Sequence, residues 1–117
     1  MADDNFAIYR SLADRSVFVT GGGSGIGESI VEHFCAQRAR VTFIDLAEEA
    51  SQALVQRIAR SGAPPPRFVH GDLRDIAGLQ AAIEAARQAN GPIRVLVNNA
   101  ANDDRHKVEA EIGRAHV

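Results

Sequence analysis

Short apolar runs alternate along this chain with longer segments in which apolar residues recur every three or four positions. The short runs are rich in β-branched and aromatic residues, as is typical of buried strands. The expected strands cover residues 15–20, 40–45, 67–70 and 93–97. The longer segments predict amphipathic helices, because their apolar residues fall on one helical face. The expected helices cover residues 26–38, 47–61 and 76–90.

The apolar face of each expected helix can be written down from the spacing alone. The three sets are Ile26, Ile30, Val31, Phe34 and Cys35; Ala50, Leu54 and Ile58; and Ile76, Leu79, Ile83 and Ala86. Proline and glycine mark where helices stop, since proline cannot continue one. Residues 62–66 end the second helix in this way, and residues 90–92 end the third.

The resulting order, βαβαβαβ with apolar strands, indicates a parallel sheet covered by helices on both faces. We therefore predict an α/β fold of the Rossmann type, a doubly wound sheet with strand order 3-2-1-4. Ligands of such sheets bind beyond the carboxyl ends of the strands. No further strand pattern follows the fourth strand, so residues 1–110 are expected to be an incomplete NAD-binding domain, truncated after that strand.

A glycine-rich loop, Thr20–Gly27, joins the first expected strand to the first expected helix. Gly21 would allow a tight turn out of the strand, and Gly25 would let the backbone approach a pyrophosphate. Gly27 would let the helix pack closely against the strand. Backbone N–H groups at a helix N-terminus favour phosphate, so the loop predicts a dinucleotide site.

Asp45 ends the second expected strand, about 20 residues beyond the loop, where a dinucleotide fold places its ribose ligand. A carboxylate there accepts hydrogen bonds from both adenosine ribose hydroxyls and repels a 2′-phosphate. The expected cofactor is therefore NAD rather than NADP. The alternative is that Asp45 only caps the helix that follows.

Two further segments complete a resemblance to the short-chain dehydrogenases/reductases, a family whose loop pattern Thr20–Gly27 matches in full. Asp72-Leu73 fits the family's acidic residue near adenine, and residues 98–101 (Asn-Asn-Ala-Ala) resemble its Asn-Asn-Ala-Gly element. The resemblance covers about residues 10–106. It implies that Asn99 and Ala100 pass beside the cofactor ribose and that Asn98 helps to hold the sheet together. It also implies that three loop residues line the pyrophosphate path: Gly21, Ser24 and Ile26.

The family's catalytic Ser, Tyr and Lys lie after the fourth strand, but this chain's single tyrosine is Tyr9 and its single lysine is Lys107. No catalytic residue and no metal ligand is assigned. The resemblance implies the NAD-binding half of an oxidoreductase that transfers hydride between NAD and an alcohol, sugar or carbonyl substrate, with this chain itself inactive. The parent resembles sugar or polyol dehydrogenases, or 3-oxoacyl reductases. The polar residues 102–106 suit a hydroxyl-rich substrate, and a solvated loop is the alternative.

Two other functions stay open. A methyltransferase also uses an acidic residue after its second strand, although Thr20 and the intact Gly25-Ile26-Gly27 argue against that class. A non-enzymatic NAD-sensing or interaction module of the same fold is the second alternative, because fold alone does not fix function.

Composition and charge limit the kinds of binding partner and the cellular location that we expect. The net charge of −2 gives no electrostatic case for nucleic acid, and no apolar stretch approaches the roughly 18 residues of a membrane span. Cys35 is the single cysteine, which fits a reducing cytoplasmic location and a packing role. The expected partners are a small-molecule substrate and, for the parent, further copies of itself.

The last seven residues, 111–117, have neither an apolar period nor turn residues suited to this fold. The final six can be encoded by a widely used sequencing-adapter sequence. We therefore expect this tail to be non-native, with a natural but unremarkable tail as the alternative.

Overall fold

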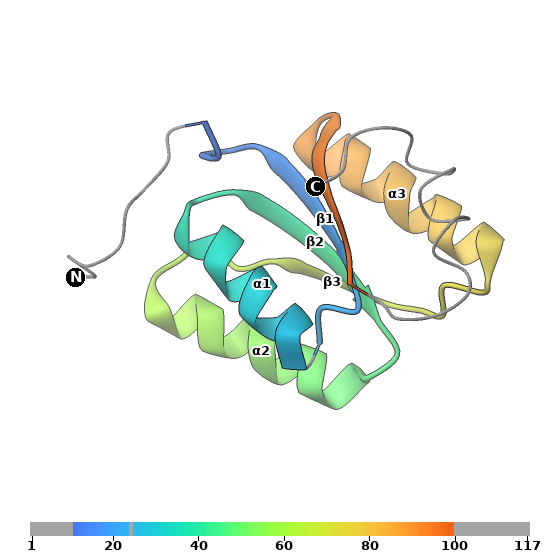
Figure 1. The fold of residues 1–117 in the computed structure, drawn as a ribbon, viewed down its shortest axis with the longest axis horizontal. Coiled ribbons are helices and arrows are strands. Elements are labelled where there is room, and N and C mark those ends of the chain that lie inside the picture. The colour runs from blue at the N-terminus through green and yellow to red at the C-terminus, as the bar shows by residue number, and fades with distance from the viewer. Residues whose placement is uncertain (1–10, 24, 100–117) are drawn as a thin grey trace.

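The computed structural model describes residues 11–23 and 25–99. Four strands and three helices alternate along these described residues (Figure 1). The strands are β1 (Ser16–Thr20), β2 (Arg40–Asp45), β3 (Arg67–His70) and β4 (Ile93–Asn98). The helices are α1 (Gly25–Ala36), α2 (Glu48–Ser61) and α3 (Ile76–Asn90). Within the described ranges, no helix has the length and apolar character needed to cross a membrane.

The four strands form one parallel sheet in the order β3-β2-β1-β4. β1 is central, pairing Val17 with Val41 of β2 on one side and with Val95 of β4 on the other. The predicted strand order and the Rossmann-like α/β class are confirmed. All carboxyl ends of the strands consequently lie at one edge of the sheet, where a ligand is expected.

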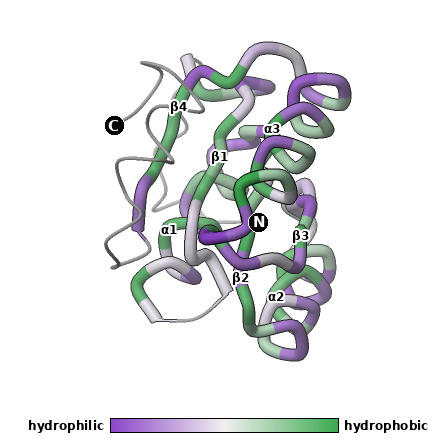
Figure 2. The backbone as a smooth tube through the Cα atoms, turned by 90° about the vertical axis from the view of Figure 1, so that its right-hand side faces the viewer, coloured by the Kyte–Doolittle hydropathy of each residue, from purple (hydrophilic) through white to green (hydrophobic). Residues whose placement is uncertain are grey.

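The sheet separates two apolar clusters, because successive residues of a strand point to opposite faces. Val17 and Val19 pack with α1 and α2 on one face, and Phe18 packs with α3 on the other. Figure 1 shows this layering, with α1 and α2 together on one side of the sheet and α3 opposite. In Figure 2 the inner strands are mainly hydrophobic, whereas α2 and α3 mix hydrophobic and hydrophilic residues, as helices with one buried face do.

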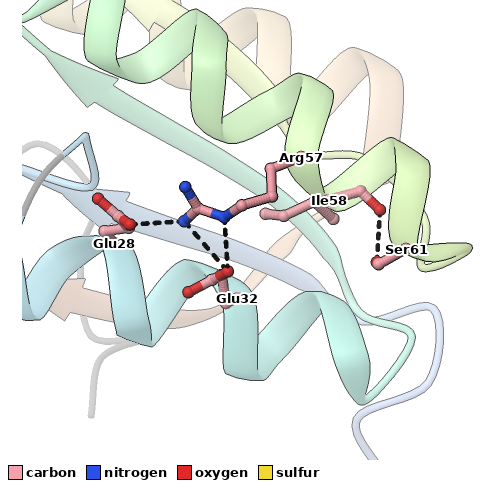
Figure 3. Close-up of polar contacts among 5 residues, drawn as sticks. All are labelled: Glu28, Glu32, Arg57, Ile58 and Ser61. Atoms are coloured by element: carbon pink, nitrogen blue, oxygen red, sulfur yellow. Dashed lines mark hydrogen bonds and ion pairs between the residues drawn. The ribbon is translucent and has the colours of Figure 1, made fainter. Parts of the chain in front are cut away.

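On the outer surface, Arg57 of α2 joins two glutamates of α1 (Figure 3). Its guanidinium donates to Glu28 and, at 3.1 Å and 3.2 Å, to Glu32. The Arg57 side chain is 47% exposed, so solvent screens the pairs and their effect on stability is small. Their structural effect is to hold α1, the helix that follows the glycine loop, against α2.

α1 ends at Ala36, two residues before its predicted end. Arg38 adopts the left-handed conformation with φ of 70°, which a right-handed helix cannot continue. The N–H of Arg38 donates to the Cys35 carbonyl at 2.9 Å, and that of Ala39 donates to the Phe34 carbonyl at 3.1 Å. These bonds form a Schellman motif, a common helix ending in which glycine usually takes the place of Arg38.

Two residues assigned to apolar faces lie elsewhere. Ile26 is 75% exposed in the first turn of α1 rather than in the core. Ala50 is exposed, and its neighbour Ser51 takes the buried position with Leu54 and Ile58. The predicted face of α2 was therefore wrong by one residue at its N-terminal end, which places a hydroxyl inside the protein.

Cys35 is fully buried in the cluster that α1 and α2 form with the sheet. Burial, with a smaller contribution from the Glu32 carboxylate, raises the pKa of its thiol to about 12. The thiol is consequently neutral at physiological pH and unsuited to nucleophilic attack, so the packing role expected for Cys35 is confirmed.

Candidate functional site

The candidate site is the sheet edge where the strands end. Gly21 leaves β1 and donates its N–H to the Ile44 carbonyl at 2.8 Å, which continues the β1–β2 pairing by one residue. Gly71 leaves β3 and donates to the Asp45 carbonyl at 3.1 Å. These bonds bring the first residues of the glycine loop, Asp45 and the segment at Asp72 to one edge.

The turn of the glycine loop is fixed by Gly21, Gly27 and Asn99. Gly21 has φ of 71°, a conformation that side chains disfavour. A Cβ built on Gly27 would overlap the Gly21 carbonyl oxygen and would lie 2.7 Å from Nδ2 of Asn99. Asn99 donates from that nitrogen to the same carbonyl at 3.0 Å. The close approach predicted at Gly27 is thus present, and Asn99 fastens the loop from the end of β4.

Gly22 and Gly23 also lack room for a side chain, and sequence reasoning gave neither a role. A Cβ on Gly22 would lie 2.8 Å from side-chain atoms of both Phe43 and Val31. A Cβ on Gly23 would overlap the Ser51 hydroxyl and lie 2.9 Å from Cγ of Asp45. Three consecutive glycines were the available signal, since such a run allows the backbone to lie directly on other residues.

A second link to β4 lies just before the loop. The buried Thr20 hydroxyl donates to Oδ1 of Asn98 at 3.1 Å, joining the ends of β1 and β4. This contact agrees with the sheet-holding role that the resemblance implies for Asn98. Thr20 and Asn98 therefore complete the edge on which Asn99 meets the loop.

Both carboxylate oxygens of Asp45 accept hydrogen bonds from backbone amides. Oδ2 accepts from Gly23 N–H at 2.9 Å, and Oδ1 accepts from Ala47 N–H at 2.7 Å. The N-cap residue of α2 is Ala47, which makes no side-chain capping bond, so Asp45 is not itself the cap. Asp45 is half-buried, and a carboxylate offers about four acceptor positions, which leaves capacity for ribose hydroxyls.

Asp72, expected near adenine, is held by Arg74, a partner that sequence reasoning missed. The Arg74 guanidinium donates to Oδ2 at 2.7 Å and its backbone N–H donates to Oδ1 at 2.9 Å. These bonds lower the pKa of the Asp72 carboxyl to about 2. Leu73 is 7% exposed and packs in the cluster beneath α3, so its side chain leaves little surface for a cofactor.

The remaining candidates divide by location. Gly25 has φ of 59° and no heavy atom near a built Cβ, so open space adjoins it at the start of α1. The exposed Ile26 follows it. The structure does not describe the other candidates, which are Ser24, Ala100 and the polar residues 102–106 that include His106.

The two described histidines, His33 and His70, are exposed at the ends of their elements, as expected. The described part of the site therefore combines the N-terminus of α1, two carboxylates and an amide side chain. These groups can bind a polar ligand that carries both hydroxyls and negative charge.

The fold and this loop define an α/β protein of the Rossmann type. The short chain dehydrogenase family matches residues 15–114. The chain belongs to this family, as the resemblance in its sequence indicated.

Relatives of the chain include sugar dehydrogenases. The probable galactose dehydrogenase of Rhizobium meliloti (strain 1021) is 49% identical over 102 residues, which are 87% of this chain and 40% of that protein. The D-xylose 1-dehydrogenase of Caulobacter vibrioides (strain NA1000 / CB15N) is 47% identical over 103 residues, 87% of this chain and 39% of the relative. The chain thus spans about two fifths of the length of these relatives.

A solved structure gives the same picture of the fold. The crystal structure of a dehydrogenase/reductase from Sinorhizobium meliloti 1021 has a TM-score of 0.71 and 34% sequence identity. The match covers 76% of this chain and 35% of that one.

Proposed function

We propose that this chain is the NAD-binding part of a sugar dehydrogenase that transfers hydride between NAD and a sugar or polyol. Family membership supports oxidoreductase activity, and the galactose and xylose dehydrogenases among its relatives support a hydroxyl-rich substrate. The polar residues 102–106, which follow the fourth strand, agree with such a substrate.

The observation that carries the cofactor proposal is the position of Asp45. Its carboxylate ends β2 and accepts from the Gly23 amide of the glycine loop at 2.9 Å. In this position it would accept hydrogen bonds from the adenosine ribose hydroxyls of NAD. It would also face the 2′-phosphate of NADP across a few ångströms, and like charges at that separation cost about 1 kcal/mol or more.

The experiment is a titration of the full-length protein with NAD and with NADP. Asp45→Asn removes the charge and keeps the side-chain shape, so we expect the preference for NAD to fall about five- to tenfold. Asp14→Asn is the matched control, since Asp14 is an exposed carboxylate just before β1, at the opposite edge of the sheet. A wild-type preference for NADP, or an equal effect of the control, would contradict the role of Asp45.

Catalysis would be completed by residues that this sequence lacks after its fourth strand. In the family a tyrosine moves the substrate proton and a lysine lowers the pKa of that tyrosine. With Tyr9 before the loop and Lys107 as the single lysine, the 117-residue chain should not reduce NAD in the presence of galactose or xylose. We further propose that the full-length protein is a homo-oligomer located in the cytoplasm.

A further inference from the structure

Two buried hydroxyls among the described residues have no hydrogen-bond partner, those of Ser16 and Ser51. Ser51 is fully buried within α2, where alanine would fit the same space and is the better helix former. An unsatisfied buried hydroxyl is destabilising, because it has lost its bonds to water without replacing them. The Ser51 hydroxyl would be explained by a second state of the protein in which it has a hydrogen-bond partner.

The surroundings of the Ser51 hydroxyl identify that partner. The atom nearest to a Cβ built on Gly23 is Oγ of Ser51, and the next is Cγ of Asp45 at 2.9 Å. The hydroxyl and the carboxylate therefore both face Gly23, as neighbours that are not hydrogen-bonded to each other. The backbone around Ser51 is held, since its N–H donates to the Ala47 carbonyl at 3.0 Å. Rotation of the two side chains is then the movement that would join them.

We propose that Ser51 is a positioning residue for ribose binding, whose hydroxyl donates to the Asp45 carboxylate when a cofactor ribose occupies it. This inference rests on the proposed NAD-binding function. In the present structure the Asp45 oxygens accept from Gly23 and Ala47. A ribose that draws the carboxylate away from Gly23 and Ala47 lengthens these two bonds, and the Ser51 hydroxyl then donates a replacement hydrogen bond to the carboxylate. The carboxylate stays oriented toward both ribose hydroxyls.

Ser16 provides a matched control for this role. Its side chain is also buried and also lacks a partner, but it begins β1, at the end of the strand opposite to the glycine loop. Ser16→Ala and Ser51→Ala therefore remove the same kind of group, one far from the candidate site and one within it.

The test uses the full-length protein and measures the NAD dissociation constant by calorimetry, together with the melting temperature without NAD. We expect Ser51→Ala to weaken NAD binding about tenfold, because hydrogen bonds to a charged acceptor are among the stronger ones. We expect Ser16→Ala to leave the dissociation constant unchanged. Neither substitution should lower the melting temperature without NAD, since each removes an unsatisfied hydroxyl.

A double-mutant cycle with Asp45→Ala separates positioning from packing. If Ser51 acts through Asp45, then Ser51→Ala has no further effect on NAD affinity once Asp45 is alanine. An equal loss with and without Asp45, an unchanged affinity of Ser51→Ala, or a lower melting temperature of that variant would each overturn the inference. Failure of the wild-type protein to bind NAD would instead overturn the proposed function. Normal wild-type binding that Asp45→Ala weakens and Ser51→Ala does not would overturn this inference alone.

Discussion

Replacement of Gly27 by alanine should damage the glycine loop before any ligand is added. The new methyl group would overlap the Gly21 carbonyl oxygen and would lie 2.8 Å from the Gly21 carbonyl carbon. It would also lie 2.7 Å from Nδ2 of Asn99. Two of these three atoms belong to the backbone, so a change of rotamer cannot relieve the overlap.

The expected loss of stability follows from three contributions. Overpacking against backbone falls at the upper end of the usual range, about 3 kcal/mol. Displacement of Asn99 removes its 3.0 Å bond to the Gly21 carbonyl, a further loss of about 1 kcal/mol. Alanine is better than glycine inside a helix by about 1 kcal/mol, which offsets part of the loss. The net expectation for Gly27→Ala is about 3 kcal/mol lower stability.

Urea unfolding of the full-length protein without cofactor measures this difference, and Gly25→Ala is its control. Gly25 has φ of 59° but no heavy atom near a built Cβ. Alanine there should lose only about 1 kcal/mol, from the left-handed backbone alone. Both variants should bind NAD poorly, Gly27→Ala because the loop is displaced and Gly25→Ala because its methyl group occupies space beside the loop.

The ranking of the two variants is the informative result. If Gly27→Ala proved as stable as Gly25→Ala, or more so, the close contact between α1 and the Gly21 carbonyl would not exist as described. Full stability of Gly27→Ala together with normal NAD affinity would also remove the glycine loop from the proposed cofactor site.

Three further predictions concern single groups. Arg38→Gly should raise stability by about 1 kcal/mol in urea unfolding, because glycine adopts φ of 70° without strain; no gain would argue against the left-handed helix ending. Asp72 should titrate by NMR with a pKa of about 2, Arg74→Gln should return that pKa toward 3.8, and an unchanged pKa in the variant would refute the pairing. Because the pKa of Asp72 is depressed in the folded protein, the contribution of the pair to stability is present above pH 3.8 and is lost as the pH falls toward 2. Cys35, with its pKa raised from 9.0 to about 12, should resist alkylation at pH 8 until denaturant is added, and rapid alkylation of the native protein would contradict its burial. The stability that comes from keeping this thiol protonated should be complete below pH 9 and should be lost as the pH rises toward 12.

The fold was predictable because its signals are strong and local. Short strands without polar alternation require cover on both faces, and the proline run after α2 leaves no doubt where that helix stops. Strand order then follows from the crossover rules for doubly wound sheets. The end of α1 at Ala36 was not predictable, since arginine rarely takes the left-handed conformation that Arg38 adopts just beyond the helix.

The glycine loop was predictable where backbone geometry requires glycine, as at Gly21 and Gly27, whereas the ribose role of Asp45 stays a prediction. The candidate site was not predictable where small residues are interchangeable. Ala50 and Ser51 are similar in size, and an apolar pattern favours the alanine, yet the structure buries the serine. Arg74 was missed because the turn that brings it back to Asp72 carries no periodic pattern.

The two links between β4 and the glycine loop have a consequence for the order of folding. The Thr20–Asn98 and Asn99–Gly21 bonds each join residues 78 positions apart. Closing a flexible chain of that length costs about 4 kcal/mol in entropy, apart from a constant. The loop between β1 and α1 is local in sequence, but its shape depends on contacts that form only when β4 docks. We therefore expect the geometry of the glycine loop to form late in folding, and any ligand that requires this geometry would also stabilise the docked fourth strand.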